Sequence, residues 1–318
     1  MTTVRDSFRD AYDAVLQEWP GPVAATELST PYGLTWVNST GPANAPPLVL
    51  LPGGRATSTV WGACAAGLGR NHRVHAVDLM GDPGLSAPAG GRRMRSVADL
   101  VAWLDAVLDG LDRSTGPAGP VELAGHSYGA WIAAHYAVHA PRRLRRLVLL
   151  DPTQVFAGFR PGYVLRALPM LARPTPRRIR TFLTWESGGA FEGAAPEGAV
   201  HEGAGHRGGV REGGGLDVAW LRLQEASAGF PAVRPVTGPR PDTARLDGTG
   251  VPVLALFAGR ARCHDAVRVA RAAAAALPGA LVDVVPGASH HTLPLTAADE
   301  ITRLMTSRPG SRPADGPS

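Results

Sequence analysis

The sequence contains no lysine. All 32 of its basic residues are arginines, set against 27 acidic residues, and the net charge is +5. The arginines are distributed along the chain, and the densest run is RRLRR, Arg142 to Arg146. Nucleic-acid-binding domains gather basic residues on one helix or stripe, whereas this run stands between a predicted helix and a predicted strand. We therefore expect a solvated surface there and no nucleic-acid partner.

Cysteine is almost absent from the chain. Cys64 and Cys263 are the only two, which is too few for a disulfide framework. Neither stands at a spacing typical of metal ligands. The prediction is two reduced structural thiols and no bound metal.

Long apolar runs are also lacking. The first twenty residues, MTTVRDSFRDAYDAVLQEWP, mix charged and apolar residues at helical spacing. This pattern fits neither a secretory signal nor a membrane span, so we expect a cytoplasmic location and no membrane partner. No phosphate loop and no dinucleotide-binding fingerprint is found, so no cofactor is expected. The sequence does not indicate an oligomeric state.

Short apolar runs rich in valine and leucine are abundant instead. Each ends in a turn and is followed by a helical pattern, in a chain of 318 residues of which 44% are hydrophobic. Such runs are typical of buried parallel strands covered by helices on both faces. The fold class predicted is a mostly parallel, doubly wound α/β sheet, preceded by an antiparallel hairpin within TELSTPYGLTWVNSTG. The runs are PLVLLPGG, HRVHAVDLMGD, PVELAGHS, RRLVLLDP, VPVLALFAG and ALVDVVPGASH.

The alternation of strand and helix stops between Thr153 and about Gly250, where helical segments follow one another without a strand. This predicts a helical cap of residues 153–250, inserted between two parts of the core, residues 1–152 and 251–307.

Two segments are predicted to be disordered. Residues 186–215 are dominated by glycine, alanine and glutamate, a composition that buries too little apolar surface to offset the entropy of ordering. A flexible loop is expected there, with His201 and His206 solvated rather than bound to a metal. The tail of residues 308–318 is expected to be disordered for the same reason.

The segment VELAGHSYGAW carries the clearest chemical signal. A predicted strand runs directly into Gly125, His126, Ser127, Tyr128 and Gly129, and a helical stretch follows. This is a GxSxG pattern in the strand-turn-helix context of a nucleophile elbow. The glycines permit a tight, strained turn that exposes the serine hydroxyl at a helix N-terminus, where free amides favour developing negative charge.

With this motif in place, the chain resembles the α/β-hydrolase family, in particular its serine esterase and lipase-like members, over nearly its whole length outside the cap. Three further segments match in order. LVLLPGG resembles the strand and turn that supply the oxyanion hole, with Pro52 in place of the usual histidine. VDLMGDPGLSAP resembles the Asp-x-x-Gly-x-Gly-x-Ser loop with one added proline. VVPGASHH resembles the last strand and the loop that carries the catalytic histidine.

The resemblance implies roles for particular residues. The backbone amides of Gly54 and Tyr128 would hold the oxyanion. Ser127 would be the nucleophile, and an imidazole must take its proton during attack. By the family spacing that base is His290, with His291 its close rival, while His126 is expected to shape the elbow.

The acid of the triad is the position at which this sequence departs from the family. Members most often carry it three residues past the glycine that ends the penultimate strand, and here that residue is Arg262, which has no acceptor. Asp265 begins the next predicted helix and is explained as its N-cap. Asp151 ends a strand in Leu-Asp-Pro, as in lipases whose acid follows that strand. Asp151 is favoured, and Asp265 is the alternative.

The function implied is hydrolysis of a carboxylic ester of a small or medium acyl group through an acyl-enzyme on Ser127. Thioesters, lactones, amides and carbon-carbon bonds use the same machinery. Dehalogenases and epoxide hydrolases carry aspartate at the elbow, so they are disfavoured. Because Arg262 and Pro52 depart from the family, a catalytically impaired relative that binds small molecules is the alternative.

Overall fold

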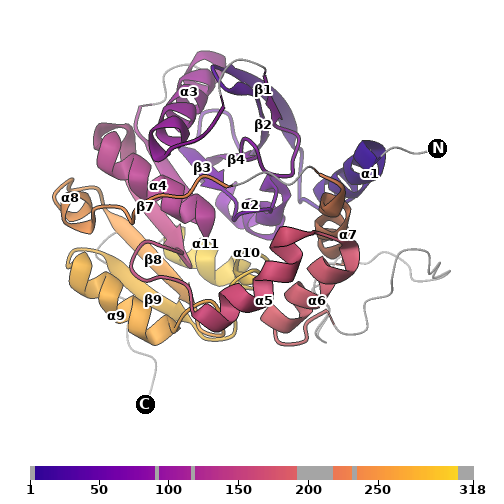
Figure 1. The fold of residues 1–318 in the computed structure, drawn as a ribbon. Coiled ribbons are helices and arrows are strands. Elements are labelled where there is room, and N and C mark those ends of the chain that lie inside the picture. The colour runs from indigo at the N-terminus through magenta and orange to yellow at the C-terminus, as the bar shows by residue number, and fades with distance from the viewer. Residues whose placement is uncertain (1–3, 90–92, 116–118, 192–217, 231–234, 307–318) are drawn as a thin grey trace.

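One sheet of nine strands organises the molecule (Figure 1). Its order is β1-β2-β4-β3-β6-β7-β8-β9, and β5 pairs with β2. The first two strands form the predicted antiparallel hairpin, and β2 pairs antiparallel with β4. The neighbouring strands β4, β3, β6, β7, β8 and β9 are all parallel. The strands are β1 Ala24–Thr30, β2 Gly33–Thr40, β3 Pro47–Leu51, β4 Arg73–Val77, β5 Ala87–Pro88, β6 Val121–His126, β7 Leu144–Leu150, β8 Val253–Ala258 and β9 Leu281–Val285.

The central strands form the core because they are apolar on both sides. Every residue of β3, β6 and β8 is buried. After β3 the chain turns to one side and forms β4, whereas β6 pairs on the other side of β3. The chain therefore reverses its direction across the sheet between β3 and β6, and α/β proteins bind ligands beyond the carboxyl ends of the strands at such a point.

Helices cover both faces of the sheet, and each face has its own buried apolar cluster. One cluster includes α3, α4, α8 and α9, and the other includes α1, α2, α5, α6, α7, α10 and α11. The helices are α1 Val4–Gln17, α2 Gly62–Leu68, α3 Val97–Thr115, α4 Tyr128–His139, α5 Pro161–Ala172, α6 Pro176–Glu186, α7 Val218–Ala226, α8 Thr243–Asp247, α9 Ala266–Ala276, α10 Leu293–Thr296 and α11 Ala298–Thr306.

The structure is a computed structural model that describes residues 4–89, 93–115, 119–191, 218–230 and 235–306. Between β7 and β8 it describes helices α5 to α8, of which α5, α6 and α7 pack in succession and α7 lies against α1 (Figure 1). Most of the predicted flexible loop, with His201 and His206, and the whole tail of residues 308–318 lie outside the described residues. None of the described helices is long and apolar enough to cross a membrane.

The arginine run Arg142 to Arg146, which leads into β7, differs from the expectation of a solvated surface. Arg143 is half-buried and pairs with carboxylates of α3, Asp109 among them at 2.5 Å. Arg146 is buried and donates hydrogen bonds to the carbonyl oxygens of Leu304, at 3.2 Å, and Met305. The prediction was wrong for Arg146 because its alternate position on β7 directs it beneath the end of α11, where it donates to carbonyl oxygens of the last helical turn.

Candidate active site

The turn between β6 and α4 holds Ser127 in a strained conformation. Its φ is 52° and its ψ is −112°, outside the regions that serine ordinarily adopts. The flanking glycines are required by space. A Cβ on Gly125 would stand 2.4 Å from the carbonyl carbon of Gly129, and a Cβ on Gly129 would stand 2.4 Å from the carbonyl oxygen of Pro52. The strand, the helix and the oxyanion loop therefore approach so closely only with glycine at both positions.

Three of the predicted residues form a continuous hydrogen-bonded chain. The Oγ of Ser127 lies 2.8 Å from Nε2 of His290, and Nδ1 of His290 lies 2.5 Å from Oδ2 of Asp151. Ser127 follows β6, Asp151 follows β7, and His290 follows β9, so the carboxyl ends of three strands of the sheet supply the group. All three side chains are buried, with 9% of Ser127 exposed. This arrangement has the geometry of a nucleophile, a base and an orienting acid.

The other candidate acid lies elsewhere. Asp265 is the N-cap of α9, and its side chain accepts a hydrogen bond of 3.0 Å from the backbone N–H of Arg268. The carboxylate is half exposed and lies 3.4 Å from a guanidinium nitrogen of Arg160. At the usual acid position, the guanidinium of Arg262 stacks over the ring of Trp185 at 4.9 Å.

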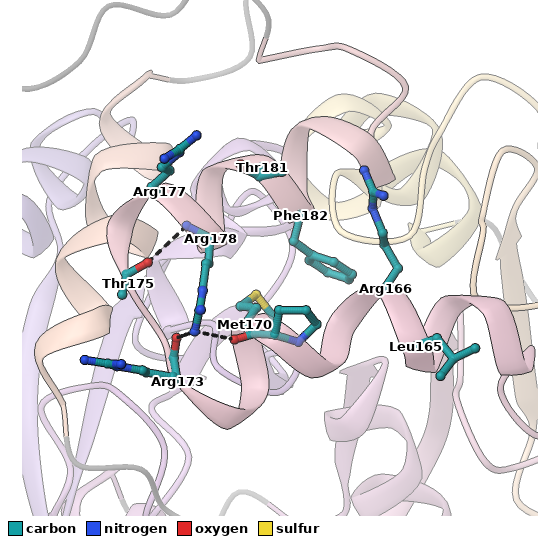
Figure 2. Close-up of a pocket in the computed structure, with 10 residues that line it drawn as sticks. Leu165, Arg166, Met170, Arg173, Thr175, Arg177, Arg178, Thr181 and Phe182 are labelled. Atoms are coloured by element: carbon teal, nitrogen blue, oxygen red, sulfur yellow. Dashed lines mark hydrogen bonds between the residues drawn. The ribbon is translucent and has the colours of Figure 1, made fainter.

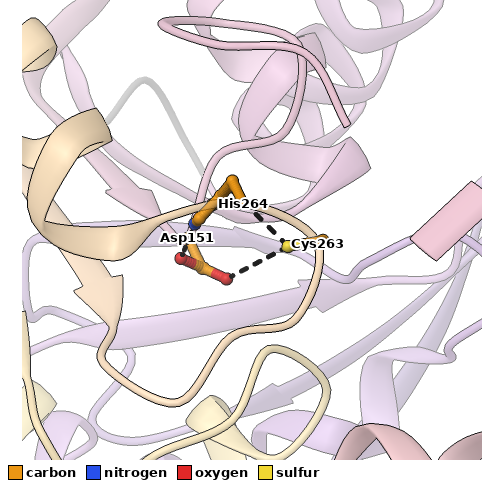
Figure 3. A group of neighbouring side chains, drawn as sticks. All are labelled: Asp151, Cys263 and His264. Carbon is orange, nitrogen blue, oxygen red and sulfur yellow. Dashed lines mark hydrogen bonds and ion pairs between the residues drawn. The ribbon is translucent and has the colours of Figure 1, made fainter. Parts of the chain in front are cut away.

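A second histidine that the sequence analysis did not consider contacts Asp151. Nε2 of His264 lies 2.8 Å from Oδ1 of Asp151, and the backbone N–H of Ala258 donates to the same oxygen at 3.0 Å. Figure 3 shows the carboxylate facing His264 and Cys263, whose Sγ is 3.9 Å from Oδ2. His264 stands two residues past Arg262, so its place in the usual acid loop was the available signal. Cys263 lies in a polar cluster rather than among apolar residues alone.

Burial and neighbouring charge set the pKa values of these groups. Burial raises the pKa of Asp151, but hydrogen bonds from His264 and His290 outweigh it and hold the pKa below its ordinary value. Burial lowers the pKa of His290, but Cys263 and Asp151 outweigh it and hold the pKa well above 6.5. Burial and the charge of His290 lower the pKa of His291 to about 3. His290 is therefore a stronger base than its neighbour, as a group that accepts the serine proton requires.

The loop that carries His290 is held from two sides. Glu186, at the end of α6, accepts hydrogen bonds from the backbone N–H groups of His290, at 3.0 Å, and His291, at 3.2 Å. It also accepts one from the hydroxyl of Ser289 at 3.1 Å. From the elbow, Nε2 of His126 lies 2.8 Å from the carbonyl oxygen of His290. Glu186 was not a sequence candidate, because no motif includes it and it was counted as the first residue of the predicted flexible loop, residues 186–215. That prediction was wrong for Glu186, which is the buried last residue of α6.

The two predicted oxyanion donors lie beside each other. A Cβ on Gly54 would stand 3.6 Å from Cβ of Tyr128, and Tyr128 is the first residue of α4. Within the described part of the chain, neither backbone N–H donates a hydrogen bond. Two N–H groups at a helix N-terminus and an adjoining glycine turn can bind a negatively charged oxygen.

A pocket of about 680 Å³ opens between α5 and α6 (Figure 2). Its wall combines the apolar side chains of Leu165, Met170 and Phe182 with the four arginines 166, 173, 177 and 178. The ring of Phe182 also packs edge-on against His291 at 5.7 Å, and the hydroxyl of Tyr163 lies 3.2 Å from Nε2 of His291. Phe182 therefore lines this pocket and also contacts His291, the residue next to His290.

The fold and the site together define a class of protein. The chain belongs to the alpha/beta hydrolase family, whose sequence model matches residues 48–304. This confirms the resemblance drawn from GxSxG and its three companion segments, and with it the predicted fold class.

The chain is similar in sequence to two carboxylesterases of Bacillus subtilis. Carboxylesterase YbfK of Bacillus subtilis (strain 168) is 31% identical over 185 residues, which is 58% of this chain and 59% of that protein. The uncharacterized carboxylesterase nap of the same strain is 31% identical over 180 residues, 56% of each chain. The alignments thus span less than two thirds of these relatives. The solved structure of naproxen esterase (carboxylesterase NP) from Bacillus subtilis superposes with a TM-score of 0.77 at 22% identity, covering 96% of this chain and 98% of the other, which establishes likeness of fold.

Proposed function

We propose that this protein is a serine hydrolase that cleaves carboxylic esters through an acyl-enzyme on Ser127. The observation that carries the proposal is the hydrogen-bonded chain from Ser127 through His290 to Asp151, buried at the carboxyl edge of the sheet. The similarity to two proteins named carboxylesterases supports an ester as the substrate.

The mechanism follows from the geometry. Oγ of Ser127 attacks the ester carbonyl carbon, and its proton passes to Nε2 of His290, 2.8 Å away. Asp151 keeps Nδ1 of His290 protonated and stabilises the imidazolium, while the amides of Gly54 and Tyr128 bind the oxyanion. The intermediate collapses, and the alcohol leaves with the proton from His290. Water then attacks the acyl-enzyme, giving its proton to His290, and Ser127 regains a proton as the acid departs.

The surroundings of His291 support a small or medium acyl group as the part that is recognised. Tyr163, Phe182 and Trp185 come from α5 and α6, and their rings pack on one another at centroid distances of 5.5 to 6.0 Å. Apolar and aromatic walls of this type favour acyl chains over strongly polar groups. An ester series from acetate to palmitate would measure the preferred length, with thioesters and lactones tested in parallel.

The alternative of a non-catalytic binding protein has weaker support. It was motivated by Arg262 at the usual acid position, but that guanidinium stacks on Trp185 while Asp151 contacts His290. A carboxylate is therefore present beside the imidazole although it comes from another strand.

A fluorophosphonate probe separates the two functions. The probe reacts covalently with an activated serine, so we expect rapid labelling of the wild type and none of Ser127→Ala. Ser96→Ala is the matched control, because Ser96 is an exposed residue before α3 and its loss should leave labelling unchanged. Folded wild-type protein that resists the probe would rule out the hydrolase and favour the binder.

A further inference from the structure

The loop that usually supplies the acid here supplies an imidazole. It runs from Gly259, after β8, to Asp265, before α9, and it places His264 directly against Asp151. Only 5% of His264 is exposed, and its ring packs edge-on against Phe257 at 6.1 Å. The hydrogen bond to Asp151 and the packing on Phe257 therefore fix the orientation of the imidazole.

The donors around Asp151 divide between its two oxygens. Oδ2 faces Nδ1 of His290, and Oδ1 accepts from the backbone N–H of Ala258 and from Nε2–H of His264. Without His264, Oδ1 would accept only from the backbone N–H of Ala258, and the carboxylate could rotate about its Cβ–Cγ bond. Such a rotation would lengthen the contact to His290, on which orientation of the base depends.

The protonation of His264 is consistent with this arrangement. Because a carboxylate accepts and never donates, the nitrogen of His264 that faces Asp151, Nε2, carries a proton. The other nitrogen, Nδ1, faces Sγ of Cys263 at 3.7 Å (Figure 3). Burial lowers the pKa of His264, but the hydrogen bond to Asp151 outweighs it and raises the pKa to about 9, so at neutral pH the ring is an imidazolium that donates from both nitrogens.

We propose that His264 is a positioning residue for the acid of the triad. It holds the carboxylate of Asp151 ionised and oriented, so that Oδ2 remains in line with Nδ1 of His290. The imidazole supplied by the loop after β8 thereby supports an acid supplied by the end of β7. The proposal rests on the hydrolase function proposed above.

Two amide substitutions test the role of Nε2. The amide nitrogen of glutamine in His264→Gln reaches about as far as Nε2 does, whereas that of asparagine in His264→Asn stops near the position of Nδ1. We expect His264→Asn to lose kcat about 10-fold to 100-fold with KM nearly unchanged, and His264→Gln to retain most of kcat. Both variants carry a neutral amide of similar polarity, so a difference in kcat between them at matched stability reports whether a donor reaches Oδ1 of Asp151. Equal kcat in the two variants would overturn the proposal.

Proton NMR of the folded protein without substrate gives a readout that does not depend on hydrolysis. We expect downfield imidazole N–H resonances from His264 and His290 in the wild type. In His264→Gln only the N–H resonance of His290 should remain, at its wild-type position. In His264→Asn the N–H resonance of His290 should shift or broaden. An unaltered His290 resonance in His264→Asn contradicts the positioning role. If ester hydrolysis were absent, fluorophosphonate labelling would fail while this NMR comparison would still decide the contact.

Discussion

At the scale of single residues, the choice of acid turns on which carboxylate reaches His290. Asp151 and Asp265 are both compatible with the chain order Ser, Asp, His. Asp151 lies 2.5 Å from Nδ1 of His290, whereas Asp265 caps α9 and points toward solvent. Asp151 has a φ of 42°, in the left-handed region that few residues other than glycine adopt.

The pair of substitutions Asp151→Asn and Asp265→Asn tests this difference with the same chemical change. In Asp151→Asn the amide cannot stabilise the imidazolium and can impose the wrong tautomer, so kcat should fall about 100-fold to 10,000-fold. In Asp265→Asn, asparagine remains a good N-cap, so kcat should be unchanged and the melting temperature should move only slightly. Steady-state kinetics and thermal unfolding measure both. Wild-type activity in Asp151→Asn would remove this aspartate from the proposed triad.

At the scale of elements, the proposed base, His290, is tied to a helix from the segment between β7 and β8. Glu186 ends α6 and accepts three hydrogen bonds from the loop of Ser289, His290 and His291. Burial raises the pKa of Glu186, and the hydrogen bonds and the charge of His290 partly offset this. The position of the base therefore depends on the packing of α6 as well as on β9.

Glu186→Gln should weaken this tie. The amide offers one acceptor oxygen and turns an N–H₂ toward donors, so we expect a loss of about 1 to 3 kcal/mol in the free energy of unfolding and a lower kcat. Glu225→Gln is the matched control, because Glu225 pairs with Arg180 between α6 and α7, away from the base. Urea unfolding and steady-state kinetics compare the two. A similar kcat in both variants would separate Glu186 from catalysis.

At the scale of the whole molecule, the site collects charged groups from strands that are distant in the sequence. Burial lowers the pKa of His290, and Cys263 and Asp151 raise it above 6.5. Asp151 follows β7, and Cys263 follows β8. The proposed base, His290, can accept a proton only when it is neutral, so the pH at which the proposed activity develops depends on how the sheet assembles these groups.

The pH dependence of kcat/KM reports this assembly. Activity should rise with pH through a midpoint above 6.5, because protonated His290 cannot accept the serine proton. In Asp151→Asn the carboxylate no longer raises the pKa of His290, so the midpoint of the residual activity should move to lower pH. Rates measured from about pH 5 to pH 10 give the midpoints. A wild-type midpoint at or below 6.5 would contradict the expected direction.

The sequence by itself determined the fold class, because apolar strand runs with turns and helical patterns report burial over short distances. GxSxG also located the elbow at Ser127, since close backbone approach requires glycine at Gly125 and Gly129. Only the tertiary structure decided which carboxylate contacts His290, since Asp151 lies 139 residues before it in the chain. The tertiary structure also decided the contacts that His264 and Glu186 make. Such contacts depend on how separate loops converge at the edge of the sheet, and no local pattern encodes that convergence.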